Sequence, residues 1–343
     1  MIMRLLIIIG CCAFLSTVAA AAERNIWIDA DPACGLGKTD DVDDCWAIIA
    51  AMRSSRLNVV GISTVFGNVS LNNAEAVARN LLTSIGTREP ALAVPPLHRG
   101  AAEPIHSDFV IPSAVGALES ALTERPLTIL ALGPLTNIAM LLRNRPDLAH
   151  RIKAIVAVGG QRPGQVFKVG STPILHFHDL NVRKDPDAFD IILRSGVSIH
   201  LVPFEVGRQA KVTRADLNFL KTNGKLDRWI GKRSRAWLSF WEHTLGASGF
   251  SPFDTVAVAY LVEPRNFLCD AMPAKIVRRR GLFVVRDSLE VAPSIRGGNL
   301  VTYCWGLSRI MRNSITEFVS NPNRTSWIHE THFLHSAATN RTR

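Results

Sequence analysis

Short apolar runs alternate with amphipathic segments along the first two thirds of the chain. The apolar runs are rich in Val, Ile and Leu, as in strands buried on both faces of a sheet, and the segments between them have helical spacing. The predicted strands span 25–29, 57–65, 91–94, 127–132, 155–158 and 198–202; the predicted helices span 43–54, 72–84, 113–122, 136–143 and 185–195. This order predicts an α/β fold, Rossmann-like, with a mostly parallel central sheet flanked by helices.

The pattern changes after residue 205 and at both ends of the chain. Helices are predicted over 210–221, 227–242 and 251–262, followed by a β-rich stretch over 275–290. Residues 1–22 carry a basic start, an apolar run and four alanines, which is typical of a signal peptide. We therefore predict export to the periplasm or the medium, with lipoprotein anchoring at Cys11 as the alternative. The apolar run is too short for a stable membrane span.

The composition narrows the class of protein. Hydrophobic residues make up 47% and charged residues 20% of the 343 residues, as in globular proteins. The net charge of +10 comes without a basic run longer than Arg278–Arg280, so no nucleic-acid partner is predicted. Four cysteines follow the predicted signal peptide without CxxC spacing, which argues against a zinc site. They are Cys34, Cys45, Cys269 and Cys304, and all three full disulfide pairings remain open.

Six aspartates lie within sixteen residues of this basic chain. Asp43 and Asp44 begin a predicted helix, where capping and the helix dipole favour carboxylates. That explanation does not extend to Asp29 and Asp31, which end a buried strand, where an unpaired charge is costly. A hard divalent cation with oxygen ligands resolves the repulsion. Asn68, Leu132 and Gly159 also follow predicted strands, so they are expected along the same edge of the sheet.

These residues resemble the motifs of the nucleoside hydrolases, the inosine-uridine-preferring superfamily. The similar blocks are Asp29-x-Asp31-Pro32 with Asp43-Asp44-x-x-Ala47-Ile48, Thr64–Asn68, Leu132–Asn137, Asp179–Asn181 leading into Asp185–Ala188, and Asp254 at the start of an Ala-rich helix. The resemblance covers residues 25 to 266. It implies a nucleoside hydrolase-like domain, placed here at 23–321 and followed by a polar tail over 322–343.

The resemblance also implies how the site works. Its Ca²⁺ ligands would be Asp31, Asp44, Asp254 and the backbone carbonyl of Leu132. Asp31 would act as the general base toward a metal-bound water, which attacks the anomeric carbon of a ribonucleoside.

The sugar would be held by Asp43 at its 2′-hydroxyl and by Asn68 and Asn181. Asp179 stands where the family usually has Glu, and Asp29 would support the site from behind. The partner implied is a nucleoside or another ribosyl small molecule, bound by a homodimer or a homotetramer.

Two departures from the family pattern concern the substrate. The loop over 33–42 is longer than in the compact motif. Phe253 precedes Asp254, where better-known members carry a His that protonates the leaving base. Trp241, by stacking, and His243, as an acid, are the candidates to take over that contact with the base.

Functions other than ribonucleoside hydrolysis also fit parts of this pattern. A catalytically impaired nucleoside- or sugar-binding protein that retains the metal site is the main alternative, and the missing His favours it. A phosphatase lacks its downstream lysine and later acidic pair. A glycosyltransferase metal motif leaves Asp43, Asp44 and Asp254 unexplained.

Overall fold

A computed structural model describes most of the chain. The described residues are 23–37, 40–108, 110–165, 167–170, 176–177, 179–280 and 285–324. The predicted signal peptide and most of the predicted C-terminal tail lie outside these residues.

The centre of the described fold is a nine-stranded sheet in the order β10-β9-β11-β8-β5-β4-β1-β2-β3. Its strands are β1 (Arg24–Ala30), β2 (Leu57–Thr64), β3 (Leu97–Arg99), β4 (Leu127–Ala131), β5 (Ile152–Ala157), β8 (Ile199–Leu201), β9 (Phe267–Arg280), β10 (Val285–Val291) and β11 (Asn299–Leu307). All pairings from β11 to β3 are parallel, and β9 and β10 extend the sheet in antiparallel fashion. The predicted fold class is confirmed.

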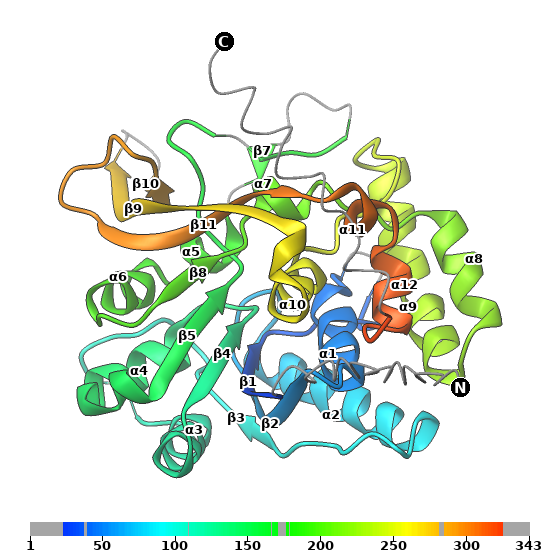
Figure 1. The fold of residues 1–343 in the computed structure, drawn as a ribbon, viewed down its shortest axis with the longest axis horizontal. Coiled ribbons are helices and arrows are strands. Elements are labelled where there is room, and N and C mark those ends of the chain that lie inside the picture. Colours follow the sequence, from blue (N-terminus) through cyan, green and yellow to red (C-terminus); the bar gives the residue numbers. More distant parts are fainter. Residues whose placement is uncertain are drawn as a thin grey trace, which may run out of the picture.

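Helices cover both faces of the sheet (Figure 1). One face carries α3 (Ser113–Glu124), α4 (Thr136–Asn144) and α6 (Pro186–Arg194), and the other carries α1 (Asp43–Arg53), α2 (Leu71–Arg88), α9 (Lys225–His243), α10 (Phe253–Val262) and α12 (Ile315–Ser320). Each face has its own buried hydrophobic cluster. Smaller elements are α5 (Leu180–Lys184), α7 (Phe204–Gly207), α8 (Arg214–Thr222), α11 (Arg309–Asn313) and the pair β6 (Phe167–Lys168) and β7 (His176–Phe177).

Three sequence-based elements need correction. The strand expected at 91–94 is wrong, because the chain joins the sheet only after Pro95 and Pro96, which have no N–H to donate. The helix expected from 210 begins at Arg214, since Thr213 caps it and Val212 instead pairs with Phe250. The pattern also does not predict β11, which is flanked by strands on both sides and so lacks a clear polar alternation.

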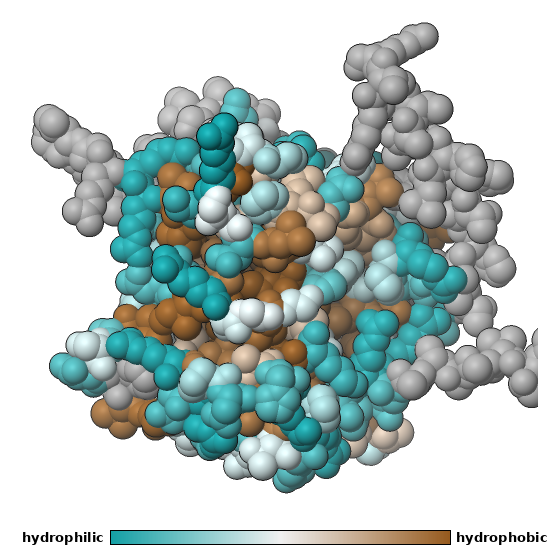
Figure 2. Space-filling view, turned by 60° about the vertical axis from the view of Figure 1, so that its left-hand side comes forward, coloured by the Kyte–Doolittle hydropathy of each residue, from teal (hydrophilic) through white to brown (hydrophobic). Residues whose placement is uncertain are grey.

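The surface combines hydrophilic areas, hydrophobic areas and ion pairs (Figure 2). Figure 2 shows one face on which hydrophilic residues predominate toward the edges and hydrophobic residues gather nearer the middle. Several arginines form ion pairs, such as Arg145 with both Glu119 and Asp147. No helix in the described part of the chain combines the length and apolar character that crossing a membrane requires.

Candidate functional site

A cavity of about 210 Å³ lies at the carboxyl ends of the parallel strands, where ligands bind in open α/β sheets. Its polar lining consists of Asp41, Asp43, Asn68, Asp179, Asn181 and Asp254. Leu132, Val158 and Gly159 also border it. The structure therefore brings six of the predicted site side chains, Trp241 among them, and the residue with the predicted carbonyl ligand to one cavity.

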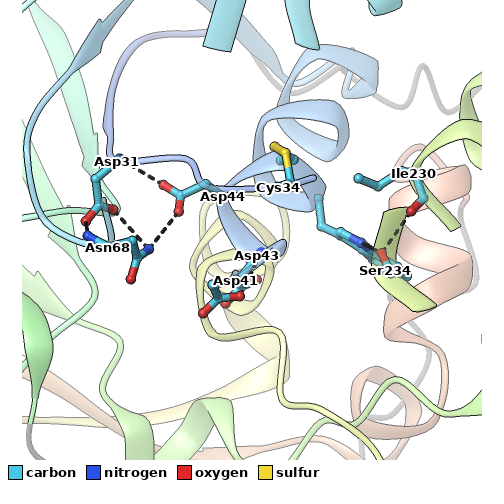
Figure 3. The surroundings of a disulfide bond; sticks show 10 residues. Asp31, Cys34, Asp41, Asp43, Asp44, Asn68, Ile230 and Ser234 are labelled. Atoms are coloured by element: carbon cyan, nitrogen blue, oxygen red, sulfur yellow. Dashed lines mark hydrogen bonds between the residues drawn. A yellow bond between two sulfur atoms is a disulfide. The ribbon is translucent and has the colours of Figure 1, made fainter. Parts of the chain in front are cut away.

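Asp31 and Asp44 are joined to this cavity through Asn68 (Figure 3). The backbone N–H of Asn68 donates to Asp31 Oδ2 at 2.6 Å. The Asn68 side-chain amide donates to both carboxylates, at 3.4 Å to Asp31 and 3.3 Å to Asp44. The backbone N–H of Asp31 donates to Asp44 Oδ1 at 3.1 Å, so the end of β1 is tied to the start of α1.

Gly67 makes the close approach of Asn68 to Asp31 feasible. A Cβ atom at position 67 would lie 1.8 Å from Asp31 Oδ2, closer than any side chain tolerates. A glycine is thus required where the turn after β2 passes over the carboxylate.

Asp43 connects α1 to α10. It is the first residue of α1, and its carboxylate accepts the backbone N–H of Asp254 at 2.8 Å and that of Thr255 at 3.3 Å. Pro252, at the N-cap of α10, provides no side-chain cap of its own. Asp43 thus supplies a negative charge at the positive end of α10 and fixes the position of Asp254.

Asn181 and Asp179 are positioned by the strand ends. The Asn181 amide donates to the carbonyl oxygen of Leu132 at 2.7 Å and to that of Val158 at 3.0 Å. Asp179 caps α5 by accepting the Val182 N–H, and it also accepts the Gly160 N–H at 2.6 Å. One predicted sugar contact, Asn181, is therefore bonded directly to the predicted carbonyl ligand, and the other, Asp179, is fixed at the start of α5.

Asp29 lies behind the site rather than in it. Its Oδ1 accepts hydrogen bonds from Ser63 at 2.5 Å and from Asn137 at 2.7 Å. Its Oδ2 is buried and has no hydrogen-bond partner among the described residues. Burial raises the pKa of Asp29 to about 6.

The carboxylates repel one another. Burial, followed by the neighbouring negative charges, raises the pKa of Asp31 and of Asp254 well above the ordinary range. The same causes raise the pKa of Asp44 to about 7. Among the described residues, no lysine or arginine forms an ion pair with these three side chains. The group therefore lacks a compensating positive charge.

The donor set fits a hard divalent cation in its chemistry. The available ligands are all oxygen, and no described residue donates a hydrogen bond to the Asp254 side chain. Within the described residues, no three His, Cys, Asp or Glu side chains are close enough together to hold a metal ion. The Asn68 amide instead bridges Asp31 and Asp44. A cation at this position would take over the charge compensation that the Asn68 amide now provides.

Sequence reasoning gave Asp41 no role, yet it lines the cavity. Its Oδ1 accepts the backbone N–H of Asp43 at 3.0 Å, and its charge raises the pKa of Asp44. The available signal was an Asp two residues before a helix, a common capping position. A disulfide between Cys34 and Cys45 closes the loop that carries Asp41 (Figure 3), and a second one joins Cys269 to Cys304.

The opposite side of the cavity is aromatic. We call it the aromatic wall: Phe167, Phe204, Trp237, Phe240, Trp241 and Phe253. Neighbouring rings touch throughout, and Phe204 stacks on both Phe167 and Phe253, with ring centroids 4.1 and 5.3 Å apart. Sequence reasoning singled out only Trp241 and Phe253 of this wall.

The structure does not bring His243 to the cavity. His243 is exposed at the end of α9, where its Nδ1 contacts the Ser239 carbonyl at 2.9 Å, and it lines a different surface hollow. Two other histidines come just before Asp179 in the sequence, and of these His178 and the side chain of His176 lie outside the described residues. His243 is thus not among the described residues that line the cavity.

Sequence comparison places the chain in a known family. The family model "Inosine-uridine preferring nucleoside hydrolase" matches residues 26–304. Non-specific ribonucleoside hydrolase RihC of Escherichia coli (strain K12 / DH10B) is 32% identical over 71% of this chain and 80% of its own. Uridine nucleosidase 1 of Arabidopsis thaliana is 29% identical over 71% of this chain and 76% of its own.

Solved structures agree on the fold. The plant nucleoside hydrolase PpNRh1 superimposes with a TM-score of 0.70 at 21% identity, over 87% of this chain and 98% of its own. The purine-preferring ribonucleoside hydrolase from Gardnerella vaginalis gives a TM-score of 0.68, with the same identity and the same coverage of both chains. The chain belongs to the inosine-uridine preferring nucleoside hydrolase family. It is a hydrolase that acts on N-glycosyl bonds, and the class of reaction is ribonucleoside hydrolysis.

Proposed function

We propose that this protein is an exported, calcium-dependent ribonucleoside hydrolase. The observation that carries the proposal is the group of buried carboxylates at the strand ends, which lacks a basic partner among the described residues. Asp31, Asp44, Asp254 and the Leu132 carbonyl would hold the cation. Once bound, Ca²⁺ supplies charge compensation and lowers the pKa of a coordinated water.

The chain's own residues account for the remaining steps. Asp31 accepts a proton from the attacking water, since its carboxylate lies beside the cavity and is held by Asn68. Asp43, Asn68, Asp179 and Asn181 orient the ribose. As the bond between the anomeric carbon and the base nitrogen breaks, the surrounding carboxylates stabilise the positive charge that develops on the sugar.

Export is supported by the two disulfides, because such bonds persist in oxidising compartments. The signal-like residues 1–22 agree with this. Sequencing the amino terminus of the mature protein from the periplasm or the medium tests it. We also expect a homodimer or homotetramer, which light scattering tests.

The test of the reaction is release of ribose from a panel of nucleosides. Activity should disappear after chelation and return with added Ca²⁺. If the protein binds Ca²⁺ but hydrolyses no N-riboside, the proposed reaction is wrong. The second candidate, a nucleoside-binding protein without turnover, is favoured by Phe253 at the position of the missing acid. Calorimetry showing nucleoside binding without hydrolysis would support it.

A further inference from the structure

The cavity is negatively charged on one side. Asp41, Asp43, Asp179 and Asp254 line it, and none of them forms an ion pair with a described lysine, arginine or histidine. One of these carboxylates, Asp41, is assigned neither to the predicted metal nor to the predicted sugar contacts at Asp43 and Asp179. A single divalent cation shared with Asp31 and Asp44 leaves a net negative charge.

The opposite side is a continuous aromatic surface. The six rings of the aromatic wall come from β6, α7, α9 and α10, and each contacts at least one other ring of the set. Aromatic faces attract cations, most strongly in a site that excludes water. Both sides of the cavity therefore favour the same charge on the ligand.

Among the described residues that line the cavity, none is His, Lys, Arg, Cys or Tyr, so only its four aspartates could protonate a leaving base. Asp43 and Asp179 use both carboxylate oxygens to accept backbone N–H groups. Asp254 is assigned to the metal, which requires its charged form, and Asp41 accepts the N–H of Asp43.

A base that already carries a positive charge needs no such donor. Water adds to the anomeric carbon, the bond to the ring nitrogen breaks, and its electron pair neutralises the ring. The products are ribose, a neutral base and the proton taken from water by Asp31. We propose that the preferred substrates are ribosides whose N-linked heteroaromatic base is cationic. This inference rests on the proposed hydrolysis of ribosides.

Two further features define the base. Trp237 and Trp241 line the cavity, and their buried indole N–H groups have no hydrogen-bond acceptor in the part of the chain that the structure describes. A carbonyl or carboxamide on the base would satisfy them. The cavity volume of about 210 Å³ is below the roughly 300–1,000 Å³ of sites for drug-sized ligands, so a ribose with one base fits the site better than a larger conjugate.

The test compares matched substrates with the purified protein and Ca²⁺. Guanosine and 7-methylguanosine differ by one methyl group and a positive charge, and the riboside of nicotinamide is a second cation. Each kcat/KM is divided by the uncatalysed rate of that compound. 4-Nitrophenyl β-D-ribofuranoside, whose leaving group needs no acid, reports on ribosyl transfer alone. Calorimetry measures binding of the same compounds.

We expect the corrected kcat/KM to be at least about 10-fold higher for 7-methylguanosine than for guanosine. Asp41→Asn and Asp179→Asn should each reduce that ratio by about 3-fold or more, and thermal unfolding verifies that the variants fold. Equal corrected values, or a ratio that neither variant changes, would overturn the inference. If the 4-nitrophenyl riboside and all nucleosides resist hydrolysis, the proposed function is wrong. In that case calorimetry tests whether the cavity selects cations. Equal affinities for guanosine and 7-methylguanosine would overturn the inference as well.

Discussion

The two sides of the cavity are built differently. The acidic side comes from short segments that directly follow β1, β2 and β4, together with the first residues of α1, α5 and α10. The aromatic wall comes from β6, α7, α9 and α10. Strand ends fix backbone positions within a sheet, whereas the wall depends on the packing of helices. In the proposed function, the first side would serve the ribose and the bond that breaks, and the second would face the leaving base.

The largest expected effect comes from the acidic side. Asp31→Ala removes a predicted metal ligand and the predicted base together, so kcat should fall by about 10³-fold or more. Calcium binding measured by calorimetry should weaken in the same variant. Assays of ribose release provide the rate.

Asp40→Ala is the matched control for Asp31→Ala. Asp40 belongs to the same connection but does not line the cavity. Its substitution should leave both the rate and the affinity for Ca²⁺ unchanged. A fully active Asp31→Ala variant would show that the two sides do not divide the work as described.

The sequence predicted the acidic side because its residues are contiguous or follow recognisable strands. Asp31, Asn68 and Leu132 each come directly after a buried apolar run or within a few residues of one, and parallel strands bring such positions to one edge. Asp254 required the family resemblance, since nothing local distinguishes an Asp at a helix start. The parallel part of the sheet was predictable because its strands are recognisable as buried apolar runs that alternate with helical segments.

The aromatic wall was not predictable in this way. Phe204 belongs to a helix of four residues, and Phe240 lies on a long amphipathic helix whose other rings could equally belong to the core. His243 illustrates the error that follows, because two residues along α9 separate a ring in the cavity from one on the surface. A helix rotates by about 200° over two residues, given 3.6 residues per turn.

A substitution in the aromatic wall tests the base-facing side separately. Phe253→His introduces a titratable ring at the position where the resemblance implies His in better-known members of the family. It should raise kcat/KM for inosine by about 10-fold or more, as expected when a general acid is restored. The affinity for Ca²⁺ should stay the same. Initial rates with inosine across pH 5 to 8 check this.

Phe253→Leu separates the acid from the loss of the ring. It removes the stacking on Phe204 without adding a proton donor, so inosine hydrolysis should not increase. An equal gain in both variants would show that space, and not proton donation, limits hydrolysis of neutral nucleosides.

The disulfides provide a further test of the acidic side, with a smaller expected effect. The Cys34–Cys45 bond encloses the loop between Asp31 and α1, at a sequence separation of 11. Replacing both cysteines with Ser should lower the free energy of unfolding by about 3 kcal/mol and weaken Ca²⁺ binding several-fold. Urea unfolding and calorimetry measure the two effects.

The Cys269–Cys304 bond is the matched control, since it joins β9 to β11 on the sheet at a separation of 35. Its removal should lower stability by about 4 kcal/mol but leave Ca²⁺ affinity unchanged. Equal losses of affinity in the two double variants would contradict a specific role of the first bond in positioning Asp31 and Asp44.

The smallest expected effect concerns Asp29, behind the acidic side. Burial raises its pKa from 3.8 to about 6, so between these values the folded state holds a proton that the unfolded chain has released. The free energy of unfolding should therefore decrease as pH rises from about 4 to 7, by about 2–3 kcal/mol for this group. In Asp29→Asn, which stays neutral, the decrease should be smaller by that amount. Urea unfolding of the metal-free protein at several pH values measures it.

For Asp29→Asn, the quantity to compare with the wild type is the slope of the unfolding free energy against pH. The absolute free energy is less informative, because the amide leaves a buried N–H₂ group without a partner and so lowers stability at every pH. Asp147→Asn provides a control of opposite sign. Its hydrogen bond to Arg145 lowers the pKa of Asp147, so this group favours folding above pH 4 and loses that contribution as pH falls. Parallel curves for the wild type and Asp29→Asn would mean that Asp29 is ionised in the folded protein even at pH 5. The unpartnered Oδ2 would then need a cation close enough to compensate it, and the acidic side would extend deeper than the cavity.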